Sequence, residues 1–191
     1  MKFSETEIEH LLKAWVAISL AFAILLSKGD VVSSNFTLML LVSGLTVGVG
    51  FIAHELGHKV VAQRYHCFAE FRASNFMLVI AVLMSFLGFI FAAPGAVIIN
   101  GYVTKERNGR ISLAGPLVNL VLALIFMGLY LFGIFVFAAK YGLIINSWLA
   151  VFNMIPILNF DGRKIIVWSK LAYYLTLAIS VGLLIVAFSL K

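Results

Sequence analysis

Long apolar runs divide this sequence, and they constrain the fold more than any other feature. They occupy residues 11–26, 36–62, 76–93, 111–139, 143–160 and 165–190. A helix needs about 20 apolar residues to cross the hydrocarbon core of a bilayer. Hydrophobic residues make up 63% of the chain, and the mean hydropathy is +1.09. The pattern predicts an all-α polytopic membrane protein with about five to six transmembrane helices.

The length of 191 residues suits one membrane domain. Polar stretches are too short for a separate soluble domain, so we expect a single integral membrane domain over 1–191. Its core would be 36–164, with flanking helices at 9–27 and 165–190. The net charge of +6 comes from basic residues in short loops, without a basic stripe interleaved with aromatic residues. We therefore expect the lipid bilayer, and no nucleic acid, around this chain.

A metal-binding pattern lies near the end of the second apolar run. His54 and His58 flank Glu55 in the motif HELGH. Histidines four residues apart share one face of a helix, where both can bind a zinc ion. Glu55 would then lie beside the metal as a candidate general base. The alternative is a polar helix end that reaches the lipid headgroups, but ionisable residues within hydrocarbon usually mark a function.

The same run predicts where the site lies in the membrane. A helix over 36–62 is about 40 Å long, more than the ~30 Å hydrocarbon thickness. If Arg64 marks the membrane surface, His54 lies roughly 15 Å below it. Gly44 and Gly48 on this helix form a GxxxG pattern, which permits close helix approach, although glycine is also simply frequent in membrane helices.

A catalytic zinc usually has three protein ligands, so one is missing from HELGH. Asp161 is, with Glu55, one of two acidic residues in or closing an apolar run. A carboxylate in that position needs a partner, and a metal ion is one. The alternative is a helix-end Asp paired with a nearby base. Other ligand candidates are His10, His66, Cys67 and Glu70.

Membrane topology favours Asp161. Its meeting with the histidines requires the segment 76–93 to dip into the membrane and return rather than cross it. Of the 14 Lys and Arg residues, 11 then lie on the side where the second run ends, and Lys28, Lys140 and Lys191 lie on the other. By the positive-inside rule the first side is cytoplasmic. We therefore expect a re-entrant segment at 76–93 near the cytoplasmic face.

Local signals complete the expected fold. Asn100-Gly101 lies between two short β-prone stretches, 97–99 and 102–104, and predicts a small β-hairpin that could offer a strand edge to a substrate or be purely structural. Residues 140–142 read as a turn between two spans. A break at Asn153 or Pro156 would let the backbone fold inward and bring Asp161 to the depth of the histidines.

Three segments together resemble the site-2 proteases, a family of intramembrane zinc metalloproteases. They are HELGH (54–58), SLAGPLVN (112–119) and FNMIPILNFDGR (152–163). The resemblance implies one zinc ion held by His54, His58 and Asp161, with Glu55 activating the water and Asn153 helping to hold substrate. Two departures stand out: Arg163 follows Asp-Gly where the family often has a second glycine, and the insert 76–93 is longer than in minimal members.

The expected function is zinc-dependent, regulated intramembrane proteolysis. The substrate would be a membrane protein, cut within or next to a transmembrane helix, at an active site nearer the cytoplasmic face of the cell membrane. A metal-ion transporter using the same His and Asp residues is the alternative, but the internal repeats usual in transporters are missing from the sequence. A metal-free structural membrane protein is a third possibility. The sequence carries no signal for an oligomeric state.

Overall fold

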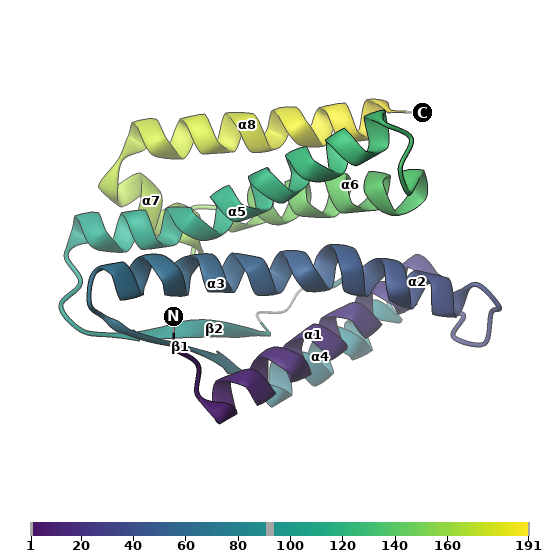
Figure 1. Ribbon diagram of the computed structural model, residues 1–191, viewed down its shortest axis with the longest axis horizontal. Coiled ribbons are helices and arrows are strands. Elements are labelled where there is room, and N and C mark those ends of the chain that lie inside the picture. Colours follow the sequence, from purple (N-terminus) through teal and green to yellow (C-terminus); the bar gives the residue numbers. More distant parts are fainter. Residues whose placement is uncertain (1, 91–93, 191) are drawn as a thin grey trace. The chain divides into compact units, whose positions relative to one another are not determined.

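The computed structural model describes residues 2–90 and 94–190 (Figure 1). The elements follow one another as α1 (Glu5–Leu26), α2 (Phe36–Ser43), the π-helix η1 (Gly44–Gly48), α3 (Val49–Arg64), β1 (Phe68–Ala73), α4 (Asn75–Ser85), β2 (Gly95–Asn100), α5 (Lys105–Leu131), α6 (Val136–Asn153), α7 (Asp161–Trp168) and α8 (Lys170–Ser189). The fold is mostly helical, as predicted.

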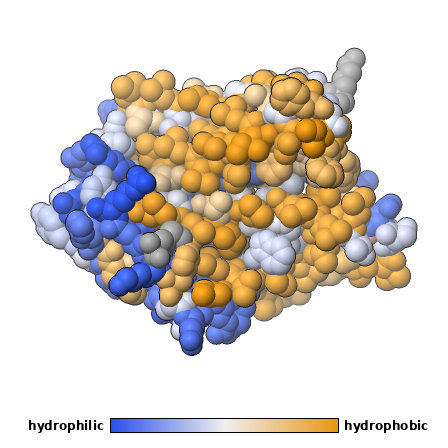
Figure 2. All heavy atoms as spheres, viewed as in Figure 1, coloured by the Kyte–Doolittle hydropathy of each residue, from blue (hydrophilic) through white to orange (hydrophobic). Residues whose placement is uncertain are grey.

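Five helices in the described residues are long and apolar enough to cross a membrane. They are α1, the continuous helix Phe36–Arg64 formed by α2, η1 and α3, then α5, α6 and α8. Figure 2 shows one face of the molecule, where apolar side chains cover most of the surface and hydrophilic ones gather at its edges. The prediction of an all-α polytopic membrane protein with a small sheet is confirmed.

The chain forms two compact units. The first contains Met1–Ile52 and Glu70–Ile98, and the second contains Ala53–Ala69 and Ile99–Lys191. All three predicted zinc ligands belong to the second unit. The expectation of one functional membrane domain stays a prediction.

In the first unit, α1 packs closely against η1. The indole Nε1 of Trp15 donates a hydrogen bond to the Gly44 carbonyl at 3.1 Å. A Cβ atom on Gly48 would lie 2.6 Å from Ser19 Oγ and 2.8 Å from the Trp15 ring. The close helix approach predicted from Gly44 and Gly48 is therefore present, and its partner is α1.

Helix α4 is too short to cross a bilayer. Its 11 residues extend for roughly 16 Å, about half the hydrocarbon thickness. It packs against α1 around a buried core of Ala14, Phe71 and Leu78. The expectation that this part of 76–93 does not cross as a helix is confirmed; residues 91–93 lie outside the described residues, and re-entry from the cytoplasmic face stays a prediction.

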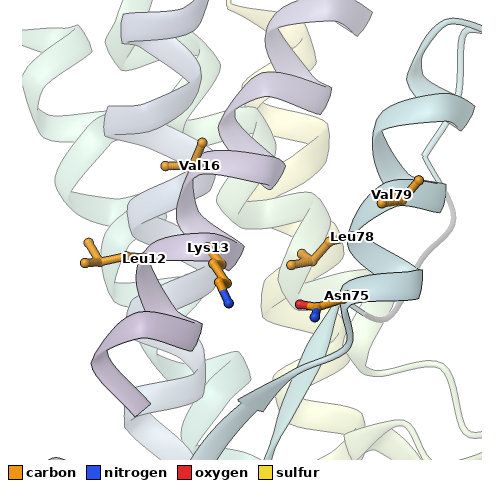
Figure 3. Close-up of a pocket in the computed structure, with 6 residues that line it drawn as sticks. All are labelled: Leu12, Lys13, Val16, Asn75, Leu78 and Val79. Carbon is orange, nitrogen blue, oxygen red and sulfur yellow. The ribbon is translucent and has the colours of Figure 1, made fainter. Parts of the chain in front are cut away.

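An apolar pocket of about 600 Å³ opens between α1 and α4 (Figure 3). Leu12, Val16, Leu78 and Val79 line it together with Lys13 and Asn75. Lys13 forms an ion pair with Glu9 one turn away, at 2.5 Å. None of the predicted zinc ligands lines this pocket.

The predicted hairpin at Asn100-Gly101 is wrong. Strand β2 pairs antiparallel with β1, which forms where the sequence suggested only a polar connection. Residues 102–104 instead lead into α5, because the Thr104 side chain accepts a hydrogen bond from the Arg107 N–H and caps that helix. Gly101 lies against Cys67 with φ of +143°, so it ends the strand without turning into a second one.

Turns in the second unit differ from expectation. The chain reverses after α5 through Gly133 (φ +72°) and Phe135 (φ +46°), whereas 140–142 lies inside α6. The sequence did not indicate this turn, because its residues are mostly apolar, like those of the helices on either side. The last apolar run also divides at Ser169, whose side chain caps α8. The predicted break is confirmed, since α6 ends at Asn153.

Helices α5, α6, α7 and α8 pack around two buried clusters. Ala123, Leu143 and Ala187 join α5, α6 and α8. Met154, Ile165 and Tyr173 join the end of α6 to α7 and α8. This second cluster holds α7, which begins at Asp161, against the rest of the unit.

Candidate metal centre

Three buried side chains meet in the second unit. His54 and His58 project from adjacent turns of α3, and Asp161 is the first residue of α7. The Nε2 atoms of the two histidines lie 3.0 Å apart. Asp161 Oδ2 lies 3.3 Å from His54 Nε2 and 3.1 Å from His58 Nε2. Among the described residues this is the one group of His, Cys, Asp and Glu side chains able to hold a metal ion.

The three ligand atoms fit a zinc ion. Bonds of 2.0–2.1 Å to tetrahedrally placed ligands separate neighbouring ligand atoms by roughly 3.3 Å. The observed separations of 3.0–3.3 Å are close to that value. Two imidazole nitrogens and one carboxylate oxygen are also the ligand set of several catalytic zinc sites, where the fourth position stays open for water or substrate.

The other ring nitrogen of each histidine has a hydrogen-bond acceptor. His58 Nδ1 lies 2.8 Å from the carbonyl oxygen of Ile111, and His54 Nδ1 lies 2.6 Å from Asn119 Oδ1. Both acceptors belong to α5. Each Nδ1 therefore carries the proton, and each Nε2 keeps its lone pair toward the cluster, as ligating histidines require.

Two residues beside the site were given no role from sequence, although the motif SLAGPLVN contains one of them. Asn119 Nδ2 donates to Asn146 Oδ1 at 3.1 Å, and Asn146 Nδ2 donates to the Gly142 carbonyl at 2.9 Å. Both asparagines are fully buried. The signal that could have found them is their chemistry, because amides within apolar membrane runs need partners.

Glycines allow the helices to approach the cluster. A Cβ atom on Gly115 of α5 would lie 2.5 Å from His58 Nε2 and 2.6 Å from His54 Cε1. A Cβ atom on Gly162 would lie 2.2 Å from the Met154 carbonyl, so only glycine lets the start of α7 reach the end of α6. Both glycines belong to motifs singled out in the sequence, and each one lets a ligand reach its place.

The neighbouring histidines favour the ionised form of the Asp161 carboxyl. Burial disfavours the charge, but the imidazoles of His58 and His54 outweigh this effect and lower the pKa of the Asp161 carboxyl below its ordinary value. Lys164 Nζ lies 3.7 Å from the other carboxylate oxygen, Oδ1. The helix-end pairing considered from sequence is thus present, while Oδ2 faces the histidines. An ionised carboxylate is the form that binds a metal.

The remaining ligand candidates lie outside the metal cluster. His10 Nδ1 accepts a hydrogen bond from the Ala73 N–H at 3.1 Å. Glu70 forms an ion pair with Arg72 at 2.8 Å. Neither these residues nor Cys67 and His66 belong to the metal cluster.

A known protein is similar to this chain over most of its length. The curated protein "Putative zinc metalloprotease MJ0611" of Methanocaldococcus jannaschii is 39% identical over 175 residues, covering 88% of this chain and 87% of the relative. This chain belongs to that zinc metalloprotease family. No family model matches the chain, and no solved structure matches it. The buried cluster able to bind a metal ion agrees with this membership, and zinc is the cofactor expected from sequence.

Two further predicted residues of this metalloprotease are present but have untested roles. Glu55 follows His54 on α3 and is 7% exposed. Asn153 is the last residue of α6, is half-buried, and donates from Nδ2 to the Leu149 carbonyl at 2.9 Å. Asn153 is not a member of the metal cluster, so its proposed contact with substrate stays a prediction.

Proposed function

We propose that this metalloprotease acts within the membrane, as the site-2 proteases do, and hydrolyses a peptide bond within or next to a transmembrane helix. One observation carries the proposal: the buried metal cluster includes two residues of a helix long enough to cross the bilayer. That helix, Phe36–Arg64, is roughly 44 Å long, and His54 lies about 15 Å before its end. A site at that depth is reached by a substrate that is itself in the membrane.

The chemistry proposed is hydrolysis with Glu55 as general base. Zinc, when bound by His54, His58 and Asp161, polarises the scissile carbonyl and lowers the pKa of water toward about 7. Glu55 takes a proton from the attacking water and passes it to the leaving amine. Its place next to His54 in the HExxH motif supports this role, because that spacing sets the glutamate beside the metal.

The substrate proposed is a membrane protein with at least one transmembrane helix. Such a helix pairs its own peptide groups, so the cut segment must unwind and become extended before hydrolysis. Asn153 closes α6 eight residues before Asp161, and its amide is a candidate to hydrogen-bond this extended segment. The cytoplasmic position of the site is likewise proposed, on the basis of the excess of basic residues on the side where α3 ends.

The decisive experiment uses the full chain purified in detergent and reconstituted into lipid vesicles. The probe is a tagged protein with one transmembrane helix that carries Gly and Asn residues near one end to ease unwinding. We expect wild-type protein with zinc to cut this probe. Glu55→Gln should abolish cutting while zinc stays bound, and Asp161→Asn should weaken zinc binding by more than the roughly 10–100-fold that follows loss of an outer partner.

Four outcomes would contradict parts of this proposal. Cutting by Glu55→Gln at the wild-type rate removes Glu55 as the base. Unchanged zinc affinity in Asp161→Asn removes Asp161 from the site. Cutting of the same peptide in soluble form, with the membrane probe untouched, leaves a metalloprotease without the intramembrane step. Zinc accumulation inside the vesicles without any cutting would favour a transporter. Lys170→Gln, at the exposed start of α8 and outside the metal cluster, is the matched control and should keep zinc.

A further inference from the structure

A chain of hydrogen bonds leads from the His54 imidazole to the backbone of α6. It runs from His54 Nδ1 to Asn119 Oδ1 (2.6 Å), from Asn119 Nδ2 to Asn146 Oδ1 (3.1 Å), and from Asn146 Nδ2 to the Gly142 carbonyl (2.9 Å). The chain joins α3, α5 and α6, and both asparagines are 0% exposed.

The last member of this chain decides the direction of all the others. A backbone carbonyl only accepts hydrogen bonds, so the Asn146 amide must turn its NH₂ group toward Gly142 and its oxygen toward Asn119. The Asn119 amide must then present its NH₂ group to Asn146 and its oxygen to His54. That oxygen accepts only from a protonated Nδ1. Each group has a single orientation that satisfies its partner.

We propose that Asn119 and Asn146 are positioning residues for the metal site, which fix the tautomer and ring orientation of His54. With the proton held on Nδ1, the Nε2 lone pair of His54 faces His58 and Asp161, where the metal ion binds. Through three successive hydrogen bonds, the Gly142 carbonyl thus determines which ring nitrogen of His54 carries the proton. The inference rests on the metal cluster of the proposed function but not on any substrate or on the intramembrane step.

The two histidines differ in how they are held. His58 Nδ1 donates directly to the Ile111 carbonyl, a backbone group that no substitution of the Ile111 side chain removes. His54 depends on two side chains. Substitution of Asn119 or Asn146 can therefore change the orientation of the His54 ring, whereas the acceptor of His58 stays in place. His58 thus serves as an internal reference within the same site.

The test compares zinc affinity and the histidine spectrum of the same variants. Zinc affinity is measured by competition with a fluorescent chelator on the purified full chain. The imidazole N–H signals are read from ¹H–¹⁵N spectra of zinc-loaded protein labelled at its four histidines. His10→Gln and His66→Gln, which remove residues outside the cluster, assign the other two signals.

Asn119→Leu removes the acceptor of His54 and keeps a side chain that branches at Cγ. We expect a loss of zinc affinity of roughly 10–100-fold, the range seen when a partner of a ligating histidine is removed. The hydrogen-bonded Nδ1–H signal of His54 should disappear while that of His58 remains. Asn119→Asp keeps an acceptor for His54 and should restore the His54 signal, because carboxylates also hold ligating histidines. The Asn146 amide must then turn its NH₂ group from Gly142 toward the new carboxylate, so zinc affinity should recover in part.

The matched control is Ser147→Ala on α6. Ser147 is fully buried beside Asn146, and its hydroxyl has no hydrogen-bond partner in the described part of the chain. This variant should keep both the affinity and the His54 signal. If Asn119→Leu alone fails to fold because Asn146 loses its donor, the double variant Asn119→Leu/Asn146→Leu removes both buried amides and takes its place.

The inference is overturned if folded Asn119→Leu, or the double variant in its place, binds zinc as tightly as wild type. It is also overturned if zinc affinity falls while the His54 Nδ1–H signal is unchanged, because the loss would then come from packing. Failure of vesicles to cut the membrane probe leaves both readouts intact, so it bears on the proposed function alone.

Discussion

Gly115 shows how closely the metal ligands are packed. It lies at the point of α5 where both imidazole rings contact that helix. Because Gly115 has no Cβ, the rings occupy the space that a side chain would fill. The motif SLAGPLVN contains both Gly115 and Asn119, so one turn of α5 supplies the room for the histidines and an acceptor for His54. The sequence pattern marked this turn without stating what either residue does.

Gly115→Ala is predicted to displace the histidines. The added Cβ would lie 2.5 Å from His58 Nε2 and 2.6 Å from His54 Cε1, well inside van der Waals contact. We expect zinc affinity to fall by at least about tenfold, as for loss of an orienting partner, and unfolding to become easier by about 1–3 kcal/mol. Chelator competition and thermal unfolding in detergent measure the two effects.

Gly128→Ala is the matched control for this prediction. Gly128 lies on the same helix, and a Cβ atom there meets no other atom within 4 Å. It should keep wild-type zinc affinity. Equal affinity in the two variants would mean that the imidazoles can move aside without loss, against the close fit described here.

At the scale of elements, the helix that carries the histidines also contains a π-helical turn. In η1 the backbone pairing changes from the α-helical pattern, and Trp15 of α1 donates to the Gly44 carbonyl there. An indole N–H is a donor only, so this bond serves a backbone oxygen where water is scarce. Close packing of α1 on η1 depends on the absence of a side chain at Gly48.

Gly48→Ala is predicted to destabilise the contact between α1 and η1. The new methyl group would lie 2.8 Å from the Trp15 ring and 2.6 Å from Ser19 Oγ. Overpacking of this kind costs about 1–3 kcal/mol, so we expect a lower unfolding temperature in detergent. Gly182→Ala on α8, where a Cβ meets nothing within 4 Å, should leave that temperature nearly unchanged. A drop of equal size in both variants would remove the packing explanation.

At the scale of the whole molecule, the distribution of charge predicts the orientation in the membrane. Long apolar helices tolerate either direction, and the Lys and Arg residues of short loops decide between them. The excess of basic residues predicts that the start of α5 lies on the cytoplasmic side and that the turn after α1 lies on the other. Helix α4, too short to cross, is the element that makes this arrangement possible.

This orientation is testable by cysteine labelling in intact cells and in inverted vesicles. The background is Cys67→Ala, which removes the single, buried native cysteine. Lys105→Cys, at the exposed start of α5, should react with an impermeant reagent only in inverted vesicles, and Lys28→Cys only in intact cells. Labelling of both from the same side would mean that the chain between residues 28 and 105 crosses the membrane an even number of times instead of once, and the cytoplasmic assignment would fall.

Much of the fold and site could be predicted because it depends on residues that are close together in the sequence. Apolar length identified the spans, and the spacing of His54 and His58 placed both on one helix face. Turns were less predictable: the reversal at 132–135 is as apolar as its neighbours, and the partner of β2 proved to be β1 rather than the next residues along the chain. Strand pairing depends on which segments approach each other, and the sequence does not record that.

The amino-acid sequence by itself therefore determined the membrane helices, the zinc-binding motif and the candidate third ligand, because burial cost and helical periodicity act on residue types. Only the tertiary structure decided that Asp161 Oδ2 lies within 3.3 Å of both histidine Nε2 atoms, and that Asn119 and Asn146 link His54 to the backbone of α6. These contacts join residues tens of positions apart. They exist because glycines at 115 and 162 let helices approach to distances that no local pattern encodes.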